Sequence, residues 1–486
     1  MTDKMTSDKL WTAYEAAAAT GGVLCARGGD AKEWLAEEWA ANGISIDTRS
    51  LKPGDMFVAL RDARDGHEFL TSAFEAGATA ALVARAPEDA PDGAPLLVVG
   101  DTLDGLRSLA QAARMRNFGK RIAVTGSAGK TSTKEILRGI LSPSGAVHAA
   151  VKSFNNHWGV PLTLARLPMR ADFGVFEIGM NHAGEITPLT TLVRPHAAIV
   201  TTVGAAHLEF FDSVEAIAEA KAEIFSGLAP GGIAILPADN EHFPLLKKRA
   251  EEAGAAGFVS FGESDDADFQ LVSYLPAGAG AQLTINVRGS RRDIIVGIPG
   301  RHQASNMLAA LAAVEAVGAD LDAAIAALGT LAPAEGRGAR LSIAVAGGDA
   351  TLIDESYNAN PASMAAAIGL LGASPIGEGG RRIAVLGEML ELGPDSPSLH
   401  ANLAKALVAA KVDRVYAAGE LMRHLWDALP AAMRGLHAGS AVGLVGPVED
   451  AIAPGDVVMV KGSNASKVSA VARALSERSK QKEGQL

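Results

Sequence analysis

The chain has 486 residues, and this length predicts about three domains, which excludes a single small binding module. Hydrophobic residues make up 48% and charged residues 20% of the sequence, a balance that excludes long disorder and fibrous repeats. Lys and Arg together number 44 against 55 Asp and Glu, giving a net charge of −11. This acidic balance argues against a nucleic-acid-binding protein but leaves room for focused phosphate sites.

One cysteine, Cys25, excludes an intrachain disulfide and a cysteine metal cluster, and such cysteine usage is typical of a reducing cytosol. The first residues carry Asp3, Lys4, Asp8 and Lys9 and no sustained apolar run, so neither a signal peptide nor a membrane span is predicted. We therefore expect a cytoplasmic protein with no nucleic-acid partner.

The first third of the chain predicts a short α/β unit. Its strand-like runs are short, apolar and bounded by turn residues, and a helical run lies between two of them. The predicted strands are residues 44–50, 55–60 and 79–84, and the predicted helix is 67–78. We expect this unit to end near residue 118.

A nucleotide-binding α/β domain is predicted after Arg121, where an apolar strand, a turn with two glycines and a helix from about Thr131 follow one another. Strands and helices alternate further along, and then come a β-rich stretch at 269–299 and a helix at 306–318. Residues 331–340 are rich in Pro, Gly and Ala and form the best linker candidate.

Beyond the linker, four strands separated by helical stretches predict a second doubly wound domain. These strands are residues 351–355, 382–388, 414–420 and 456–462. The predicted domains are therefore 1–118, 119–332 and 333–486.

The clearest motif is IAVTGSAGKTSTKEIL, in which a strand leads into Gly126, Gly129, Lys130 and Thr131. In such a turn, backbone N–H groups surround phosphate oxygens, a lysine neutralises them and a Thr hydroxyl can hold Mg²⁺. The loop is shorter than the usual phosphate loop, because Val124 stands where the first Gly is expected. A tight strand-to-helix connection without a ligand is the alternative, but the GKT triplet favours a phosphate site.

Polar residues follow further strands of the predicted central domain. Glu177 ends an apolar strand, where a carboxylate could bind Mg²⁺ or could simply be solvated. Asn155, Asn156 and His157 form a cluster that suits either ligand contacts or loop caps. His207 also follows a strand, and a metal ligand, an acid-base group and a surface histidine all remain open for it.

Lys221 lies on the apolar face of a predicted helix, seven residues after Val214. A lysine in such a place costs free energy unless its ammonium reaches solvent, is paired or is modified. The sequence leaves these alternatives open.

In chain order, the segments TGSAGKTSTKE, SFNNHWGVPLTL, FEIGMNHAGEI, GRHQASNMLAAL, DESYNANPASM, VLGEMLELG and VMVKGS resemble the Mur ligases. The resemblance covers nearly the whole chain. It implies an α/β fold of three domains: an N-terminal UDP-substrate domain, a central P-loop ATPase domain and a C-terminal Rossmann-like domain. NNHWGVPLTL, GMNHAGEI and SYNANP look most like members that join D-alanyl-D-alanine to UDP-N-acetylmuramoyl-tripeptide.

The resemblance also implies roles for individual residues. Catalysis would rest on Lys130, on Lys221 as a lysine carbamylated by CO₂, on His207 and on Arg340. ATP and Mg²⁺ would be bound by residues of two domains, with Glu177, His207, Thr131 and Lys221 as metal ligands. The expected ATP-binding residues are Gly126, Ser127, Gly129, Lys130, Thr131, Ser132, Asn306, Arg340, Asp354, Glu355, Tyr357, Asn358 and Asn360. The expected substrate-binding residues are Ser45, Asp47, Thr48, Arg49, Asn155, Asn156, His157, Lys461 and Ser463.

Two arginines, Arg337 and Arg340, compete for the phosphate contact from the C-terminal domain, and the distance in sequence to Asp354 favours Arg340. The implied reaction is ATP-dependent amide formation through an acyl-phosphate, carried out by a cytoplasmic monomer. Within the family, addition of a single amino acid and folylpolyglutamate synthesis are alternatives, although the N-terminal DTRSLKPGDMFVAL segment argues against the folate enzyme. A nucleotide-driven switch protein is the alternative from another class.

Overall fold

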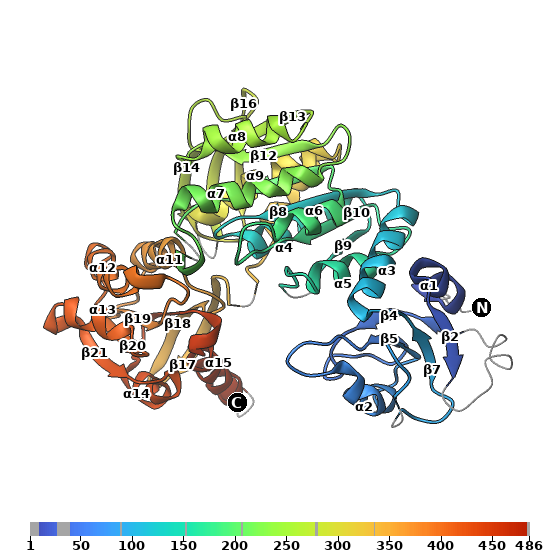
Figure 1. Cartoon of the computed structure of the whole chain (residues 1–486). Helices are drawn as coiled ribbons and strands as arrows, with labels where there is room; N and C mark the ends of the chain where they lie inside the picture. Colours follow the sequence, from blue (N-terminus) through green and yellow to red (C-terminus); the bar gives the residue numbers. More distant parts are fainter. Residues whose placement is uncertain are drawn as a thin grey trace, which may run out of the picture.

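The computed structural model of the chain describes residues 9–26, 39–87, 90–150, 153–205, 208–277, 280–334 and 336–483. Their strands form a two-stranded sheet and three larger sheets, and each larger sheet belongs to a different part of the chain. Figure 1 shows these parts as three bodies, with the central one joining an N-terminal and a C-terminal body that lie apart from each other. The predicted α/β fold with three domains is therefore confirmed.

The N-terminal body contains a five-stranded sheet in the order β2-β7-β6-β5-β4, in which β2 alone runs antiparallel to its neighbour. The small sheet pairs β1 (Trp11–Thr12) with β3 (Ala40–Ala41). The strands are β2 (Val23–Ala26), β4 (Gly43–Ser45), β5 (Asp55–Val58), β6 (Ala80–Val83) and β7 (Pro95–Val98), and the helices are α1 (Ala13–Thr20), α2 (Leu70–Glu75) and α3 (Thr102–Arg116).

The N-terminal body packs firmly on the central body. One apolar core runs through both, from Trp11 and Ile44 to Phe225. Hydrogen bonds cross the same boundary: for example, the Trp11 indole donates to the Ala165 carbonyl over 2.9 Å, and Arg166 Nε donates to the Ile44 carbonyl over 2.6 Å. This shared core fixes the position of the N-terminal body beside the central sheet.

The central body contains a nine-stranded sheet in the order β16-β15-β14-β13-β12-β11-β8-β10-β9. The strands from β8 to β14 are parallel to their neighbours, and β15 and β16 add an antiparallel extension. The strands are β8 (Lys120–Thr125), β9 (Val147–Ala149), β10 (Phe173–Glu177), β11 (Ala197–Val200), β12 (Ile233–Pro237), β13 (Gly257–Gly262), β14 (Phe269–Ala277), β15 (Gly280–Val287) and β16 (Ser290–Val296).

Helices cover both faces of this sheet, which explains why its middle strands are continuous apolar runs. They are α4 (Lys130–Leu141), α5 (Gly159–Ala165), α6 (Ile186–Val193), α7 (Val214–Ala222), α8 (Phe243–Glu252), α9 (Arg301–Ala316) and α10 (Leu321–Ala327). Helix α9 is apolar nearly all round and is buried from Met307 to Val314, as expected for a helix enclosed by the sheet and α4.

The C-terminal body contains a six-stranded sheet in the order β17-β18-β22-β19-β20-β21, parallel except for β17. Separate cores lie on its two faces. The strands are β17 (Ala339–Val345), β18 (Gly348–Glu355), β19 (Arg382–Gly387), β20 (Arg414–Ala418), β21 (Arg434–Ala438) and β22 (Val457–Lys461), and the helices are α11 (Pro361–Ala373), α12 (Ser396–Ala409), α13 (Met422–Ala428), α14 (Val445–Ala451) and α15 (Ser469–Glu483).

The sequence predicted most of the strands of the C-terminal sheet but not the strands at its two edges. The four strands expected beyond the linker are β18, β19, β20 and β22, whereas the edge strands β17 and β21 were missed. The helix predicted at 67–78 is a 3₁₀ turn at Gly66–Phe69 followed by the short α2. The predicted boundary at 118 falls between α3 and β8, and the one at 332 falls before β17.

Candidate functional site

The loop from β8 to α4 has a backbone that only glycine suits. Gly126 and Gly129 have φ of 150° and 84°, and a Cβ on Gly126 would overlap the Thr201 hydroxyl. A Cβ on Gly129 would overlap the Asn306 side chain of α9. The loop therefore places the N-terminus of α4 at an open cavity. The free N–H groups and the positive dipole end of the helix lie there, which is the arrangement that phosphate binding requires.

Lys130 is the first residue of α4, and its ammonium donates to the Gly126 carbonyl of its own loop over 2.7 Å. Burial lowers the pKa of this ammonium, and Arg337 lowers it further, whereas the Glu177 carboxylate raises it. Lys130 thus places a cation beside the cavity, close to one carboxylate and to one cation of the C-terminal body.

Glu177 lies at the end of β10 with only 2% of its surface exposed. Its carboxylate accepts hydrogen bonds from Thr131 Oγ1 over 2.7 Å, Ser153 Oγ over 2.6 Å and Asn155 Nδ2 over 2.8 Å. Burial alone would raise the pKa of Glu177, but Lys130 and the three donors outweigh it and lower the pKa, so the group is ionised at neutral pH. The alternative of a solvated strand end is wrong.

The oxygen atoms gathered around Glu177 fit a magnesium ion. Thr131 and Ser153 contribute hydroxyls that lie 3.3 Å apart, and Glu177 contributes an ionised carboxylate. Hard oxygen donors of this kind are the ligands that Mg²⁺ prefers in proteins. No group of three His, Cys, Asp or Glu side chains suitable for a metal occurs among the described residues, and His207 lies outside them.

Lys221 lies on α7 and is 1% exposed, so the alternative that its ammonium reaches solvent is wrong. In the described part of the chain, no hydrogen bond or ion pair engages its Nζ atom. Burial lowers the pKa of Lys221 far below its ordinary value, and repulsion from Lys130 lowers it further. The amine is therefore buried near the phosphate loop in an environment that disfavours its positive charge.

A cavity of about 470 Å³ joins the phosphate loop to the C-terminal body. The two bodies touch at its edge, where Asn360 Nδ2 donates to the Ser127 carbonyl over 3.0 Å. Asn360 also caps α11 through Ser363, which fixes its side chain. Of the residues predicted to bind ATP, the cavity is lined by Ser127, Gly129, Lys130, Thr131, Ser132, Asn306, Glu355, Tyr357, Asn358 and Asn360.

Lys461 reaches this cavity from the end of β22. Its ammonium lies 3.5 Å from the Glu355 carboxylate and donates to the Asn358 carbonyl over 3.0 Å. Ser463 and Asp354 do not line the cavity, because Ser463 accepts a hydrogen bond from the Ser466 backbone and Asp354 accepts one from the Ser356 backbone. Both therefore serve local turns in this structure.

The structure separates the two competing arginines. Arg337 lines the cavity, and its guanidinium lies 4.1 Å from the centre of the Tyr357 ring. Arg340, on β17, points elsewhere and donates to Ser374 Oγ over 2.9 Å. The side chain that is brought to Lys130 is thus Arg337, and not the Arg340 favoured by spacing.

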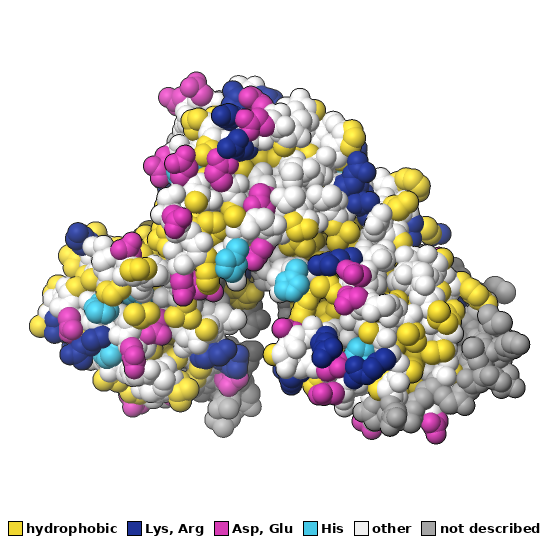
Figure 2. Space-filling model, viewed as in Figure 1, with side chains coloured by type: hydrophobic (Ala, Val, Ile, Leu, Met, Phe, Trp, Pro, Cys, Tyr) yellow, Lys and Arg dark blue, Asp and Glu magenta, His cyan; other side chains and the backbone are white. Residues whose placement is uncertain are grey.

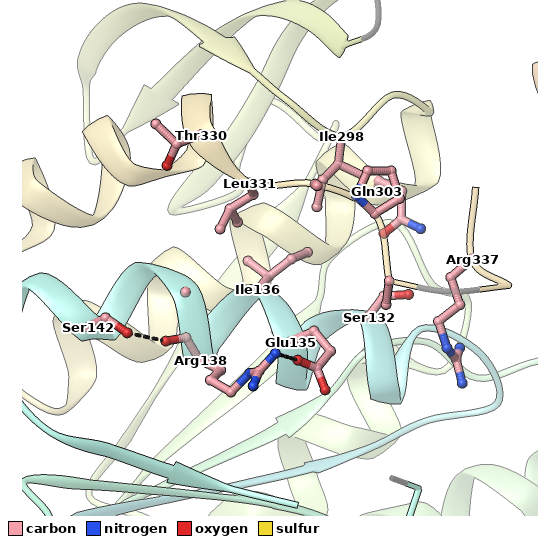
Figure 3. A pocket seen from close by; sticks show the side chains of 14 residues that line it. Ser132, Glu135, Ile136, Arg138, Ser142, Ile298, Gln303, Thr330, Leu331 and Arg337 are labelled. Atoms are coloured by element: carbon pink, nitrogen blue, oxygen red, sulfur yellow. Dashed lines mark hydrogen bonds and ion pairs between the residues drawn. The ribbon is translucent and has the colours of Figure 1, made fainter. Parts of the chain in front are cut away.

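A second cavity, also of about 470 Å³, runs along α4 beneath the linker between the central and C-terminal bodies. Figure 3 shows Glu135 and Arg138 of α4 paired on one side and Leu331 and Ile298 on the other. Ser132, Gln303 and Arg337 line both cavities, so the two spaces are neighbours.

The residues predicted to bind substrate are only partly brought together. Asn155 lines the first cavity, but Asn156 accepts hydrogen bonds from the Trp158 and Gly159 backbones, as a loop cap does. His157 is exposed against Trp158. The remaining four lie at the end of β4 and just after it in the N-terminal body, and they do not line either cavity: Ser45, Asp47, Thr48 and Arg49. Arg49 pairs there with Asp47 over 2.7 Å.

Sequence reasoning missed Ser153, Gln303 and His302, which line the cavity from loops and from the first turn of α9. A serine two residues before Asn155 gives no signal of its own, since the hydrogen bond to Glu177 depends on two segments meeting in space. The sequence could have suggested His302 and Gln303 only through their place just before the buried helix.

Among the described residues, no helix is long and apolar enough to cross a membrane. The Mur ligase middle domain family matches residues 124–314, and the family described as Mur ligase, glutamate ligase domain matches residues 336–464.

Two relatives are named UDP-N-acetylmuramoyl-tripeptide--D-alanyl-D-alanine ligase. The protein from Escherichia coli (strain K12) is 38% identical and is aligned over 90% of this chain and 94% of its own length. The protein from Rickettsia prowazekii (strain Madrid E) is 32% identical over 88% of this chain and 93% of its own length. Both alignments include the N-terminal body as well as the two matched domains.

Solved structures show the same fold. MurF from Acinetobacter baumannii superposes with a TM-score of 0.81 at 29% identity, covering 96% of this chain and 99% of that one. MurF from Thermotoga maritima in complex with ADP gives a TM-score of 0.75 at 26% identity, covering 90% and 98%. These likenesses extend over all three bodies, and the chain belongs to the Mur ligase family.

Proposed function

We infer that this chain is an ATP-dependent ligase that joins D-alanyl-D-alanine to UDP-N-acetylmuramoyl-tripeptide. The observation that carries this inference is the cavity in which a phosphate loop, an ionised buried carboxylate and side chains of the C-terminal body meet. The names of the relatives, which align over nearly the full chain, supply the substrates. The proposed domains are 1–118 for the UDP-substrate, 119–332 for ATP and 333–486 for closure of the site. We place the protein in the cytoplasm as a monomer.

The phosphates of ATP would lie on the N-terminus of α4, against Lys130 and the glycine loop. The adenosine would lie toward the second cavity, which shares Ser132, Gln303 and Arg337 with the first. Asn306 packs against Gly129 and so links the loop to α9. The structure of the Thermotoga maritima relative in complex with ADP supports nucleotide binding by this fold.

Thr131 and Glu177 would hold Mg²⁺, with His207 and a carbamate formed from CO₂ on Lys221 as further ligands. Bound there, the ion would withdraw charge from the phosphate oxygens. Conversion of the Lys221 amine to an anionic carbamate would replace the repulsion between Lys221 and Lys130 by attraction. The hydrogen bonds from Ser153 and Asn155 orient the Glu177 carboxylate toward Thr131.

The reaction would proceed in two displacements. The terminal carboxylate of the peptide attacks the γ-phosphorus of ATP, so that ADP leaves and an acyl-phosphate forms. The amine of D-alanyl-D-alanine then attacks the acyl carbon, phosphate leaves with its electron pair, and the amine loses a proton. Both steps concentrate negative charge beside Lys130 and Arg337, which stabilise it electrostatically.

The muramoyl substrate would extend from the cavity toward the N-terminal body. Asn155 is suited to contact the sugar-peptide part from the cavity wall. Ser45, Asp47, Thr48 and Arg49 would hold the UDP end. For D-alanyl-D-alanine, Lys461 is the better placed of the two residues predicted from the resemblance, since it lines the cavity and Ser463 does not.

Product formation with a panel of amines tests this function. With ATP, Mg²⁺ and UDP-N-acetylmuramoyl-tripeptide, we expect phosphate release and a new amide with D-alanyl-D-alanine and only background release with single amino acids. Preference for a single amino acid would assign the chain another role in the family. ATP hydrolysis that needs neither acceptor nor amine would instead indicate a nucleotide switch.

Replacing Arg337 with alanine should lower kcat about a hundredfold, because this guanidinium is the one that faces Lys130 across the cavity. Replacing Arg340 with alanine should lower kcat far less and act mainly on stability, through the lost hydrogen bond to Ser374. Steady-state kinetics and thermal unfolding of both variants check this ranking. The reverse ranking would return the phosphate contact to Arg340.

A further inference from the structure

The edge of the central body opposite the nucleotide cavity carries an unusual surface. Strand β8 begins there at Lys120, whereas its other end feeds the phosphate loop. We call this surface the basic edge and define it by eight residues from the end of α3, the start of β8, the loop after α5 and the end of α6: Arg114, Met115, Phe118, Lys120, Arg121, Met169, Arg170 and Arg194.

Three large apolar side chains of the basic edge stand out into solvent. Phe118 is 94% exposed, Met115 67% and Met169 58%. Phe118 and Met169 line one shallow hollow of about 390 Å³, so they belong to the same patch. Single exposed apolar residues are ordinary, but Phe118 and Met169 lie exposed in one hollow, and Met115 is exposed three residues before Phe118, which marks a contact surface.

Cations surround these apolar side chains. Lys120 and Arg170 line the same hollow, and Arg121 Nη1 donates to the Gly119 carbonyl between Phe118 and Lys120. Asp172 contributes a carboxylate to the lining of the hollow, and this carboxylate accepts a hydrogen bond from the Ala146 backbone over 2.8 Å. The hollow therefore combines exposed apolar groups with positive charge.

The arginines of the basic edge repel one another. Burial lowers the pKa of Arg121 to about 10, and Arg114 and Arg194 contribute to the lowering. Burial likewise lowers the pKa of Arg114, with Arg194 adding to it, and no carboxylate of the described residues opposes the lowering at Arg114 or Arg121. In a chain with a net charge of −11, this positive cluster of Arg114, Arg121 and Arg194 is a local exception.

Capping of α6 explains part of this cluster. Arg114 and Arg121 donate to carbonyls at the C-terminal end of α6, including those of Leu192 and Val193, where cations are favourable. That role does not involve Lys120 or the exposed Phe118. Figure 2 shows Lys and Arg side chains together with hydrophobic ones along the right-hand edge of the central body, near the place where Figure 1 shows α3 leading into β8.

We propose that the basic edge docks the protein onto an anionic lipid surface. Phe118, Met115 and Met169 enter the boundary between headgroups and acyl chains, and the surrounding cations face the lipid phosphates. This pairing of inserted apolar side chains with basic ones is the combination that peripheral membrane binding uses. Docked in this way, the protein keeps the cavity at the opposite edge of the sheet open to solvent, so that soluble substrates still enter.

Co-sedimentation of the full chain with lipid vesicles tests the proposal. Vesicles of equal parts phosphatidylglycerol and phosphatidylcholine should bind the chain about tenfold more strongly than vesicles of phosphatidylcholine alone, and salt should weaken this binding. Phe118→Ser with Met115→Ser, and separately Lys120→Glu with Arg194→Glu, should each reduce binding about tenfold. Val442→Ser with Lys405→Glu is the matched control, since it changes an apolar residue that is 71% exposed and an exposed lysine in the C-terminal body.

Each other outcome overturns the proposal. Absence of vesicle binding, equal binding to both kinds of vesicle, or equal losses in the control variant would do so. Displacement from vesicles by millimolar pyrophosphate would show a site for free phosphate instead, and tighter binding of polyglutamate than of vesicles at the same edge would show a surface for an acidic protein. Ligase turnover with soluble substrates should stay unchanged in all these variants, which separates this test from that of the proposed function.

Discussion

Replacing Lys221 with alanine should abolish most turnover, by about a hundredfold or more, and added acetate should restore part of it. The reason is that burial, with 1% of the residue exposed, and repulsion from Lys130 disfavour the charged form of this amine. A carbamate requires a neutral amine, and the lowered pKa of Lys221 supplies one at a pH where an exposed lysine is protonated. Acetate would place a carboxylate in the vacated space and supply the missing anionic oxygen.

Arginine should not replace Lys221. Its guanidinium remains positive and would add repulsion beside Lys130 and the metal. Kinetics of Lys221→Ala with and without acetate, and of Lys221→Arg, therefore distinguish a required anion from a required cation. Full activity of Lys221→Arg, or a bare amine at Lys221 in a crystal of the complex with ATP and Mg²⁺, would rule the carbamate out.

A matched control is available on the neighbouring helix. Lys248 of α8 has a side chain that is 69% exposed and pairs loosely with Glu252 at 3.8 Å. Lys248→Ala should leave kcat and the metal dependence unchanged. Thermal unfolding of Lys221→Ala should show a folded protein, because removing a buried amine that lacks a hydrogen bond in the described chain does not orphan a partner.

The parts of the site that the sequence predicted are those in which local backbone and residue type carry the chemistry. Gly126 and Gly129 adopt conformations that disfavour other residues, so the phosphate loop can be recognised without its surroundings. The parallel strands were likewise evident, because strands buried on both faces are apolar throughout. Glu177 followed from its place at the end of such a strand.

Other features depend on tertiary contacts that no local pattern contains. Arg337 and Arg340 lie three residues apart, and the start of β17 at Ala339 decides between them. Arg337 stays in the connection before the strand and stacks on Tyr357, whereas Arg340 takes the direction that its strand position imposes and reaches Ser374. Spacing along the chain cannot resolve this choice, because it says nothing about where the strand begins.

Asparagines illustrate the same limit. Asn155 and Asn156 are adjacent and of one type, yet Asn155 donates to Glu177 and Asn156 caps the start of α5. Asn360 also has two roles, since its oxygen caps α11 and its nitrogen reaches Ser127 of the central body. A cap can be predicted from a short segment, but a contact between domains requires the fold.

Replacing Lys130 with alanine should remove turnover, by about a hundredfold or more, while leaving the fold intact. Within the described residues, its ammonium donates a hydrogen bond to the Gly126 carbonyl and lines the cavity, so it contributes little to the core. Its loss would remove the cation that neutralises the phosphates of ATP. It would also leave Glu177 without the nearest cation that lowers its pKa, so the pKa of that carboxylate should rise.

The expected rise in the pKa of Glu177 allows a second measurement of this prediction. Lys130 helps to hold the folded-state pKa of Glu177 below its ordinary value. As the pH is lowered, the residual activity of Lys130→Ala should therefore begin to fall at a higher pH than the activity of the wild type does. Lys405→Ala, an exposed change on α12, is the control and should alter neither turnover nor the pH profile. Unaltered turnover with an unchanged KM for ATP in Lys130→Ala would refute the assignment of the phosphate loop.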